Sequence, residues 1–139
     1  MLKKLLLIIT LLSLSNVAMA EFIFIGSALD ETTYVYADPS TIIRSKNISK
    51  MWDLFSFTSI QTISGSGEPF LSSITYAEYD CVQKTGKTLS EVRYSGGMRS
   101  GKIVSSYNYN DGRIVNVHEP IIPDSLSESL WKIACGKKL

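Results

Sequence analysis

The chain contains two cysteines, and their positions constrain its fold more than any other feature of the sequence. Cys81 follows a strand-like run in EYDC, and Cys135 lies far downstream in the closing segment SESLWKIACGKKL. Two thiols in one small domain usually pair in an oxidising compartment, and a count of two allows a single connectivity. Whether the pair forms therefore depends on the compartment in which the chain folds.

The N-terminal segment MLKKLLLIITLLSLSNVAMA predicts export. Two lysines precede an apolar run, and the segment closes with the small-residue pattern AMA. This order predicts a secretory signal peptide over residues 1–20, followed by a single domain over residues 21–139 that begins at Glu21. A membrane anchor is disfavoured because the apolar run is shorter than the roughly 20 residues that span a bilayer. No later stretch is long and apolar enough to span.

In an exported protein the two thiols are expected to form a structural disulfide, Cys81–Cys135, that clamps the C-terminal segment to the rest of the domain. The alternative is a redox-active or metal-binding thiol. The sequence has no CxxC spacing, and its one histidine, His118, gives too few ligands for zinc. We therefore expect no metal and no cofactor.

Most of the exported domain has the residue pattern of antiparallel strands. Runs rich in β-branched and aromatic residues predict strands over residues 33–37, 48–57, 70–81, 88–95 and 102–109. Asp38-Pro39-Ser40 is expected to end the first strand, and SGSGEP predicts a loop. The pair Asp111-Gly112 is a strong hairpin signal, so residues 113–117 are expected to return antiparallel to the strand before them.

The last segment changes to helical spacing, with apolar residues three and four positions apart from Leu126 onward. Ser125 followed by Glu128 fits a capping box, and Gly136 is placed to end the helix. Strands followed by one terminal helix predict an α+β fold. We expect a small antiparallel β-sheet of about five to six strands with one C-terminal α-helix, disulfide-linked to the sheet.

The charge of the domain excludes one large class of function. Removing residues 1–20 takes away two of the 14 basic residues and none of the 13 acidic ones, which leaves a net charge of −1. A nucleic-acid-binding domain is expected to show a strong cationic excess. We therefore expect no nucleic-acid partner.

No sequence motif predicts an enzyme. The tripeptide GKT at residues 86–88 resembles the end of a P-loop, but Cys81 occupies the place of the motif's first glycine and a strand is predicted to follow. No G-x-S-x-G motif presents a serine to His118, which is expected to be exposed beside Glu119. We therefore assign no catalytic residue.

One pair of carboxylates could still divide acid and base roles. Glu78 and Asp80 are two residues apart and so share one face of a predicted strand. The reading that we favour is a solvated face, with Arg93 on a neighbouring strand as the counter-charge. A small hydrolase remains a third, minor hypothesis on this ground.

A basic and tyrosine-rich stretch lies between Lys84 and Arg113. It carries six basic residues against Glu91 and Asp111, together with three tyrosines. Tyrosine and arginine on a rigid sheet are typical of protein-binding faces. The alternative is that these side chains only coat the solvated face of an antiparallel sheet. The candidate partner-binding residues are Arg93, Arg99, Lys102, Tyr107 and Tyr109.

Several quoted stretches resemble one known family. These stretches are YVYADPSTIIRSKNISKMWDLFSF, then EYDC followed by TLSEVRYSGGM, and finally PDSLSESLWKIACG. Together they resemble the surface-adhesin protein E family of Gram-negative bacteria. The resemblance covers nearly the whole exported domain. It implies a small antiparallel sheet carrying a C-terminal helix, with the two family cysteines at Cys81 and Cys135. Two features differ: NDGRIVNVHEPIIPDS lacks the expected tryptophan, and no lipid-anchor cysteine follows the signal.

The resemblance and the absence of a catalytic motif favour an exported, non-enzymatic binding module at the envelope or cell surface of a Gram-negative bacterium. Its partner would be an extracellular-matrix protein or an acidic glycan. The alternative is a periplasmic, envelope-associated structural protein without host contact, which the absence of an anchor cysteine favours. In both hypotheses the chain has no transmembrane span after the signal is removed.

Overall fold

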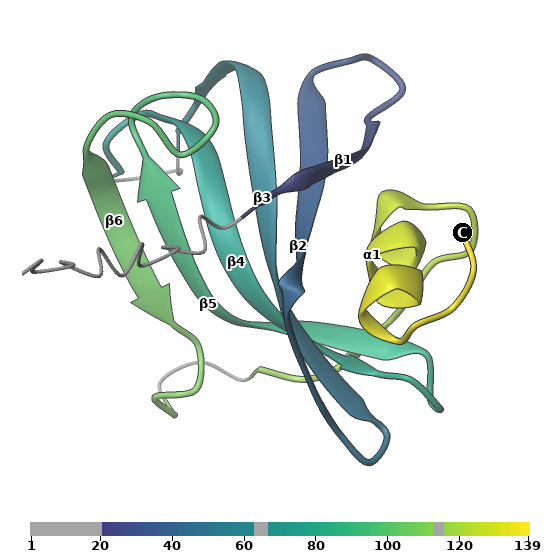
Figure 1. Ribbon diagram of the computed structural model, residues 1–139. Helices are drawn as coiled ribbons and strands as arrows, with labels where there is room; N and C mark the ends of the chain where they lie inside the picture. The colour runs from purple at the N-terminus through teal and green to yellow at the C-terminus, as the bar shows by residue number, and fades with distance from the viewer. Residues whose placement is uncertain (1–20, 63–66, 113–115) are drawn as a thin grey trace, which may run out of the picture.

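The computed structural model describes residues 21–62, 67–112 and 116–139, which form a curved antiparallel sheet with one helix packed on it (Figure 1). The sheet has seven strands in the order β1-β2-β3-β4-β5-β6, with β7 paired to β5. The strands are β1 (Ile23–Ser27), β2 (Thr33–Ser45), β3 (Ile48–Gln61), β4 (Phe70–Asp80), β5 (Thr85–Tyr94), β6 (Ile103–Asn108) and β7 (Glu119–Pro120). The expected α+β fold is confirmed.

Strand β2 continues through the point where a break was predicted. Its pairing with β3 shifts between Asp38 and Ile43, so the irregular residues form a bulge within the strand. Pro39 can occupy this position because a bulge does not require its missing N–H. The Thr41 hydroxyl replaces part of the ladder by accepting a hydrogen bond from the Trp52 backbone N–H at 3.0 Å. The expectation that Asp38-Pro39-Ser40 ends the strand is wrong for this reason.

The predicted hairpin after Asp111-Gly112 falls partly outside the described residues. Residues 113–115 of its return arm lie outside the described residues, and residues 116 and 117 are in no strand. The chain pairs instead with the first half of β5, where β7 lies opposite Thr85 and Gly86. This half of β5 is available because β6 pairs only with residues 90–94.

The helix α1 (Leu126–Ala134) has the caps that its sequence predicts. The Ser125 side chain accepts a hydrogen bond from the Glu128 backbone N–H at 3.1 Å. The Glu128 carboxylate reaches back to the backbone N–H of Asp124, one residue before the position of a standard capping box, at 2.7 Å. Gly136 adopts a positive φ of 67° just after the helix, as a C-terminal glycine cap requires.

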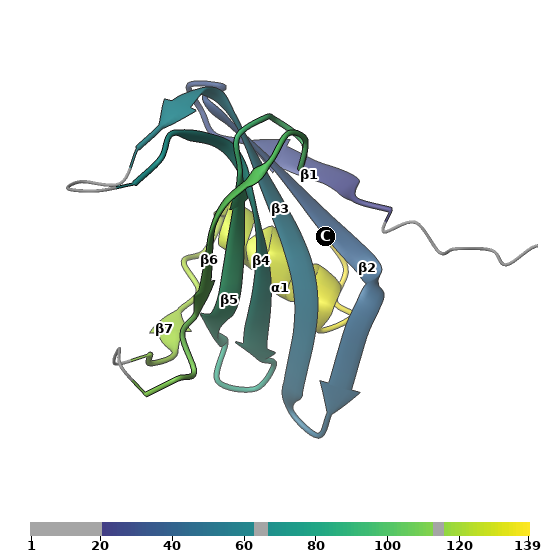
Figure 2. The same ribbon diagram turned by 90° about the vertical axis from the view of Figure 1, so that its left-hand side faces the viewer.

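The core lies between α1 and the first strands of the sheet. Figure 2 shows the helix behind β2, β3 and β4, so it covers one face, called here the inner face. The buried core residues on that side are Val35, Ala37, Met51, Ala77, Tyr79, Leu130, Trp131 and Ala134. Side chains alternate along a strand, so Met51 points to the helix while Trp52 lies on the opposite, outer face.

The C-terminal end of the helix is fixed to the sheet by polar and covalent links. The Trp131 indole N–H donates to the Asp80 carbonyl at 2.9 Å, and the Ser49 hydroxyl donates to the Ala134 carbonyl at 2.5 Å. The predicted disulfide joins Cys81 to Cys135, with their Cα atoms 5.6 Å apart. Within the described ranges, no helix is long and apolar enough to cross a membrane.

Candidate functional site

Beyond the helix, the inner face of β4, β5 and β6 carries an aromatic and charged cluster, called here the Arg93 cluster. Its members are Phe70, Glu91, Arg93, Tyr107 and Tyr109. The Arg93 guanidinium donates two hydrogen bonds to the Glu91 carboxylate, each at 2.9 Å. The same guanidinium lies 4.9 Å from the Phe70 ring centroid and 4.7 Å from the Tyr107 ring centroid. Arg93 is therefore held by one bidentate ion pair and by two aromatic rings.

The tyrosines of this cluster are ordered by the same carboxylate. The Tyr109 hydroxyl donates to Glu91 at 2.9 Å, and the Tyr107 and Tyr109 rings stack with their centroids 6.2 Å apart. Burial and the hydrogen bond to Glu91 raise the pKa of Tyr109 to about 12, so it remains a protonated donor. The cluster is thus preorganised, which lowers the entropy cost of using it as a contact surface.

The two other candidate cations lie in the loop between β5 and β6. The Arg99 backbone N–H donates to the Ser72 hydroxyl at 2.9 Å, and Ser72 is on the outer face. The Lys102 ammonium lies 3.3 Å from the Glu68 carboxylate in an exposed ion pair. The structure therefore brings Arg93, Tyr107 and Tyr109 together and leaves Arg99 and Lys102 outside their cluster.

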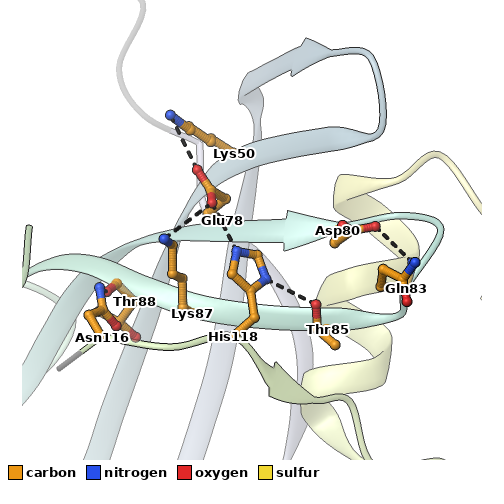
Figure 3. A network of polar contacts seen from close by, with 9 residues as sticks. All are labelled: Lys50, Glu78, Asp80, Gln83, Thr85, Lys87, Thr88, Asn116 and His118. Atoms are coloured by element: carbon orange, nitrogen blue, oxygen red, sulfur yellow. Dashed lines mark hydrogen bonds and ion pairs between the residues drawn. The ribbon is translucent and has the colours of Figure 1, made fainter.

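The outer face carries a separate polar network around Glu78 (Figure 3). The His118 Nε2 atom lies 3.0 Å from the Glu78 carboxylate, and its Nδ1 atom lies 3.0 Å from the Thr85 hydroxyl. The ammonium groups of Lys50 and Lys87 lie 3.4 and 3.6 Å from the same carboxylate. Burial opposes ionisation of Glu78, but the His118 hydrogen bond and the two lysines outweigh it and lower its pKa.

This network corrects two expectations. His118 is half-buried and bonded, so the prediction that it is exposed is wrong; the return of the chain beside β5 places it over Glu78. Arg93 is not the counter-charge of Glu78, because the register pairs Arg93 with Ser73, whose side chain is on the inner face. Lys50 and Lys87 take that role.

Asp80 does not complete a catalytic pair with Glu78. Its carboxylate accepts hydrogen bonds from the backbone N–H groups of Gln83 and Val82, at 2.8 and 2.9 Å, and points into the β4–β5 turn (Figure 3). These bonds lower the pKa of Asp80. Both carboxylates are held ionised, one in a turn and one among cations, so their environments do not separate an acid from a base.

A cavity of about 710 Å³ opens on the inner face between the sheet and α1, and its wall includes a buried aspartate that no sequence motif marks. Asp53 is 1% exposed and accepts a hydrogen bond from the Tyr79 hydroxyl at 2.6 Å. Burial raises the pKa of Asp53 to about 8, against the opposing effect of that hydrogen bond. The sequence signal was one aspartate inside the apolar run MWDLFSF.

The described residues contain no group of three or more histidine, cysteine, aspartate or glutamate side chains placed to hold a metal ion. Among the described residues, the buried side-chain polar atoms without a hydrogen-bond partner belong to Asp38, Asp53 and Arg93. The inner-face arrangement is suited to contact and binding by preorganised side chains.

Two solved structures with a similar fold are of the same protein. Two structures of protein E from Haemophilus influenzae match this chain, each at 12% sequence identity and over 81% of its length. They are covered over 83% and 75% of their own chains, with TM-scores of 0.56 and 0.54. At this identity the likeness shows a common fold. No curated protein has significant sequence similarity to the chain.

The comparison with family models shows the family of the chain as well as its fold. The family model described as Surface-adhesin protein E matches residues 22–136, which is most of the chain and includes both cysteines, the Arg93 cluster and the helix. The resemblance seen in the sequence motifs is thereby confirmed. This chain belongs to the surface-adhesin protein E family.

Proposed function

We propose that this chain is an exported, non-enzymatic binding module that holds a macromolecular partner through the β5–β6 region. The observation that carries the proposal is the family match over residues 22–136, which supports an adhesin-like role. The partner proposed is an extracellular-matrix protein or an acidic glycan. The binding surface would combine the Arg93 cluster with the exposed cations of the loop between β5 and β6.

The two parts of this surface have different physical roles. Arg93 is paired with Glu91, so its contribution is to hold Tyr107 and Tyr109 in fixed positions for contact. Tyrosines with restricted side chains provide contact area at low entropy cost. Lys102 is largely exposed, and Arg99 lies in the same loop, so these two cations would attract an acidic partner over distance. Such attraction is weakened by salt.

The charge-reversal variant Arg99→Glu with Lys102→Glu tests this surface. We expect weaker association with an acidic partner and a smaller salt dependence, because the steering charges are reversed. The free energy of unfolding should change by less than about 0.5 kcal/mol, since exposed charges away from packed sites contribute little. Binding to heparin and to matrix proteins, measured at low and moderate salt, gives the readout.

Lys137→Glu with Lys138→Glu is the matched control, because these two exposed lysines lie beyond the helix and outside the proposed surface. The control carries the same change in net charge and should bind as the wild type does. Equal loss in both double variants would assign the effect to net charge and reject the β5–β6 surface.

Export is proposed from the signal-like segment at residues 1–20, which lies outside the described residues. The family and the disulfide support it, because disulfides persist in oxidising compartments. We expect the intact mass of the exported protein to match a chain that begins at Glu21. A mass that includes residues 1–20 would contradict cleavage at this site.

A periplasmic, envelope-associated structural role is the second candidate. Both cysteines of the sequence are in the disulfide, and a lipid anchor attached through a cysteine would need a further thiol. Protease treatment of intact cells separates the two candidates. Cleavage of the protein on intact cells supports surface display, whereas protection that is lost when the outer membrane is opened supports the periplasmic role.

A further inference from the structure

The cavity between the sheet and α1 has the size and lining of a small-molecule site. Its volume of about 710 Å³ lies within the range that holds small organic ligands. Strands β3, β4 and β5, the residue that follows β6, the chain around β7 and one side of the helix all contribute to its wall. Phe55, Phe57, Ile121 and Leu130 supply apolar surface to this cavity.

One polar atom in this wall lacks a partner. The Asp53 Oδ2 atom accepts the hydrogen bond of Tyr79, but the Oδ1 atom is buried and has no hydrogen-bond partner in the part of the chain that the structure describes. Leaving a buried polar atom unpaired costs free energy, and such atoms are rare in native proteins. Asp53 lines the cavity, and a small rotation of its carboxyl group toward the cavity would let a ligand there supply the missing partner.

The charges around the cavity indicate what that partner is. The carboxylates of Asp53 and Glu119 line the cavity from β3 and β7, together with the Glu91 carboxylate of β5, which is already paired with Arg93. The only lysine in the lining is Lys87, and its ammonium pairs with Glu78 on the outer face. The helix contributes the uncharged residues Ser127 and Leu130. The surroundings of Asp53 therefore favour a cationic ligand.

We propose that this cavity binds a small organic amine, with its apolar body against Phe55, Phe57 and Leu130 and its ammonium donating a hydrogen bond to the Asp53 Oδ1 atom. This site goes beyond the proposed adhesin-like function, because it takes a small molecule and not a macromolecule. No covalent step is involved. The ammonium would satisfy the unpaired oxygen and neutralise the charge of a buried carboxylate.

The site predicts proton release on binding. Burial raises the pKa of Asp53 to about 8, so the carboxyl of the ligand-free protein holds a proton at neutral pH. An arriving ammonium favours the ionised carboxylate, and the proton leaves to solvent. Tyr79 and Tyr109 stay protonated in this range, since burial raises the pKa of each. Amine affinity should therefore rise by up to about tenfold for each unit of pH between about 6 and 8.

Calorimetric titration of the protein with benzylamine, 2-phenylethylamine and hexylamine tests the proposal. Phenylethanol and phenylacetate are the neutral and anionic comparison probes. We expect at least one amine to bind at least about tenfold more tightly than both comparison probes, with proton release detected as a dependence on buffer ionisation heat. Absence of saturable amine binding, or equal binding of the alcohol, would overturn the proposal.

Three variants locate the binding. Asp53→Asn should weaken amine binding by at least about tenfold, because it removes the charge while keeping the shape. Glu78→Gln removes a carboxylate from the outer face and should leave amine affinity unchanged. Ser127→Trp adds bulk at an exposed helix position on the cavity wall and should block binding without disturbing the buried core. Unchanged amine affinity in both Asp53→Asn and Ser127→Trp would place the binding elsewhere.

Discussion

Replacing Cys135 by serine is expected to lower the free energy of unfolding by about 4 kcal/mol. The Cys81–Cys135 bond closes a loop with a sequence separation of 54 residues, and on the loop-entropy argument a closure of this length stabilises a domain by about that amount. Without the disulfide the helix is held by packing and by individually weaker polar links, such as those of Trp131 to Asp80 and of Ser49 to Ala134, so its C-terminal turn should be the first part to loosen. Urea unfolding of the exported protein measures the change.

The double variant Cys81→Ser with Cys135→Ser should cost about as much as either single variant, because all three remove the same covalent link. Wild-type protein treated with a reducing agent should unfold at the same urea concentration as the double variant. Two free thiols in the native exported protein, or additive costs of the two single variants, would contradict the clamp.

Replacing Asp53 by asparagine is expected to raise the free energy of unfolding at pH 7 by up to about 4 kcal/mol. The pKa of Asp53 is raised from 3.8 in the unfolded chain to about 8 in the folded protein, because burial disfavours the carboxylate. Its favourable effect on stability is therefore complete below about pH 4 and is lost progressively as the pH rises to about 8. Asparagine has no charge to bury, so its variant should lack this slope.

Unfolding of wild type and Asp53→Asn between pH 5 and pH 9 measures this difference. Glu78→Gln is the matched control, because the pKa of Glu78 is lowered in the folded protein. Glu78 stabilises the fold above its unfolded pKa and loses that effect only as the pH falls through its folded value, so between pH 5 and pH 9 its contribution is constant and Glu78→Gln should keep the wild-type slope. Parallel pH profiles of wild type and Asp53→Asn would contradict a neutral buried carboxyl.

The two largest expected changes in stability indicate different roles for the disulfide and for Asp53. The disulfide stabilises the domain, whereas the buried carboxyl of Asp53 reduces its stability at neutral pH. A titratable group kept at such a cost beside a cavity is typical of a functional site. If Asp53→Asn is both more stable and unable to bind amines, its carboxyl is retained for binding.

Local patterns predicted the helix and the disulfide correctly. The caps at Ser125 and Gly136 depend on residues within a few positions of each other, and two cysteines leave one pairing. The strand errors arose where tertiary contacts override local signals. Pro39 fits within β2 because the Thr41 hydroxyl accepts the hydrogen bond of the Trp52 backbone N–H at this bulge. Strand β1 was not predicted, because it is short. Its Gly26 lies close to Leu126 of the helix, and a contact between residues so far apart in the sequence cannot be read from a local pattern.

The candidate site was only partly predictable because strand register decides which side chains share a face. Residue types identified Arg93, Tyr107 and Tyr109, which the structure brings into one cluster. The contact of this cluster with Glu91, and its separation from Glu78 on the other face, follow from the register of β4 with β5. That register shifts between Tyr76 and Ala77. The position of His118 depends on the path of the chain beside β5, which the residues alone did not show.

The central claim, that this chain is a binding module, is tested most directly by equilibrium binding of the purified protein, residues 21–139 with the disulfide intact, to immobilised matrix proteins and acidic glycans. The account predicts saturable binding to at least one of them, weakened by salt and by Arg99→Glu with Lys102→Glu. It predicts unchanged binding by Lys137→Glu with Lys138→Glu. No saturable binding to any of these partners, by a protein that unfolds cooperatively and is therefore folded, would contradict the account.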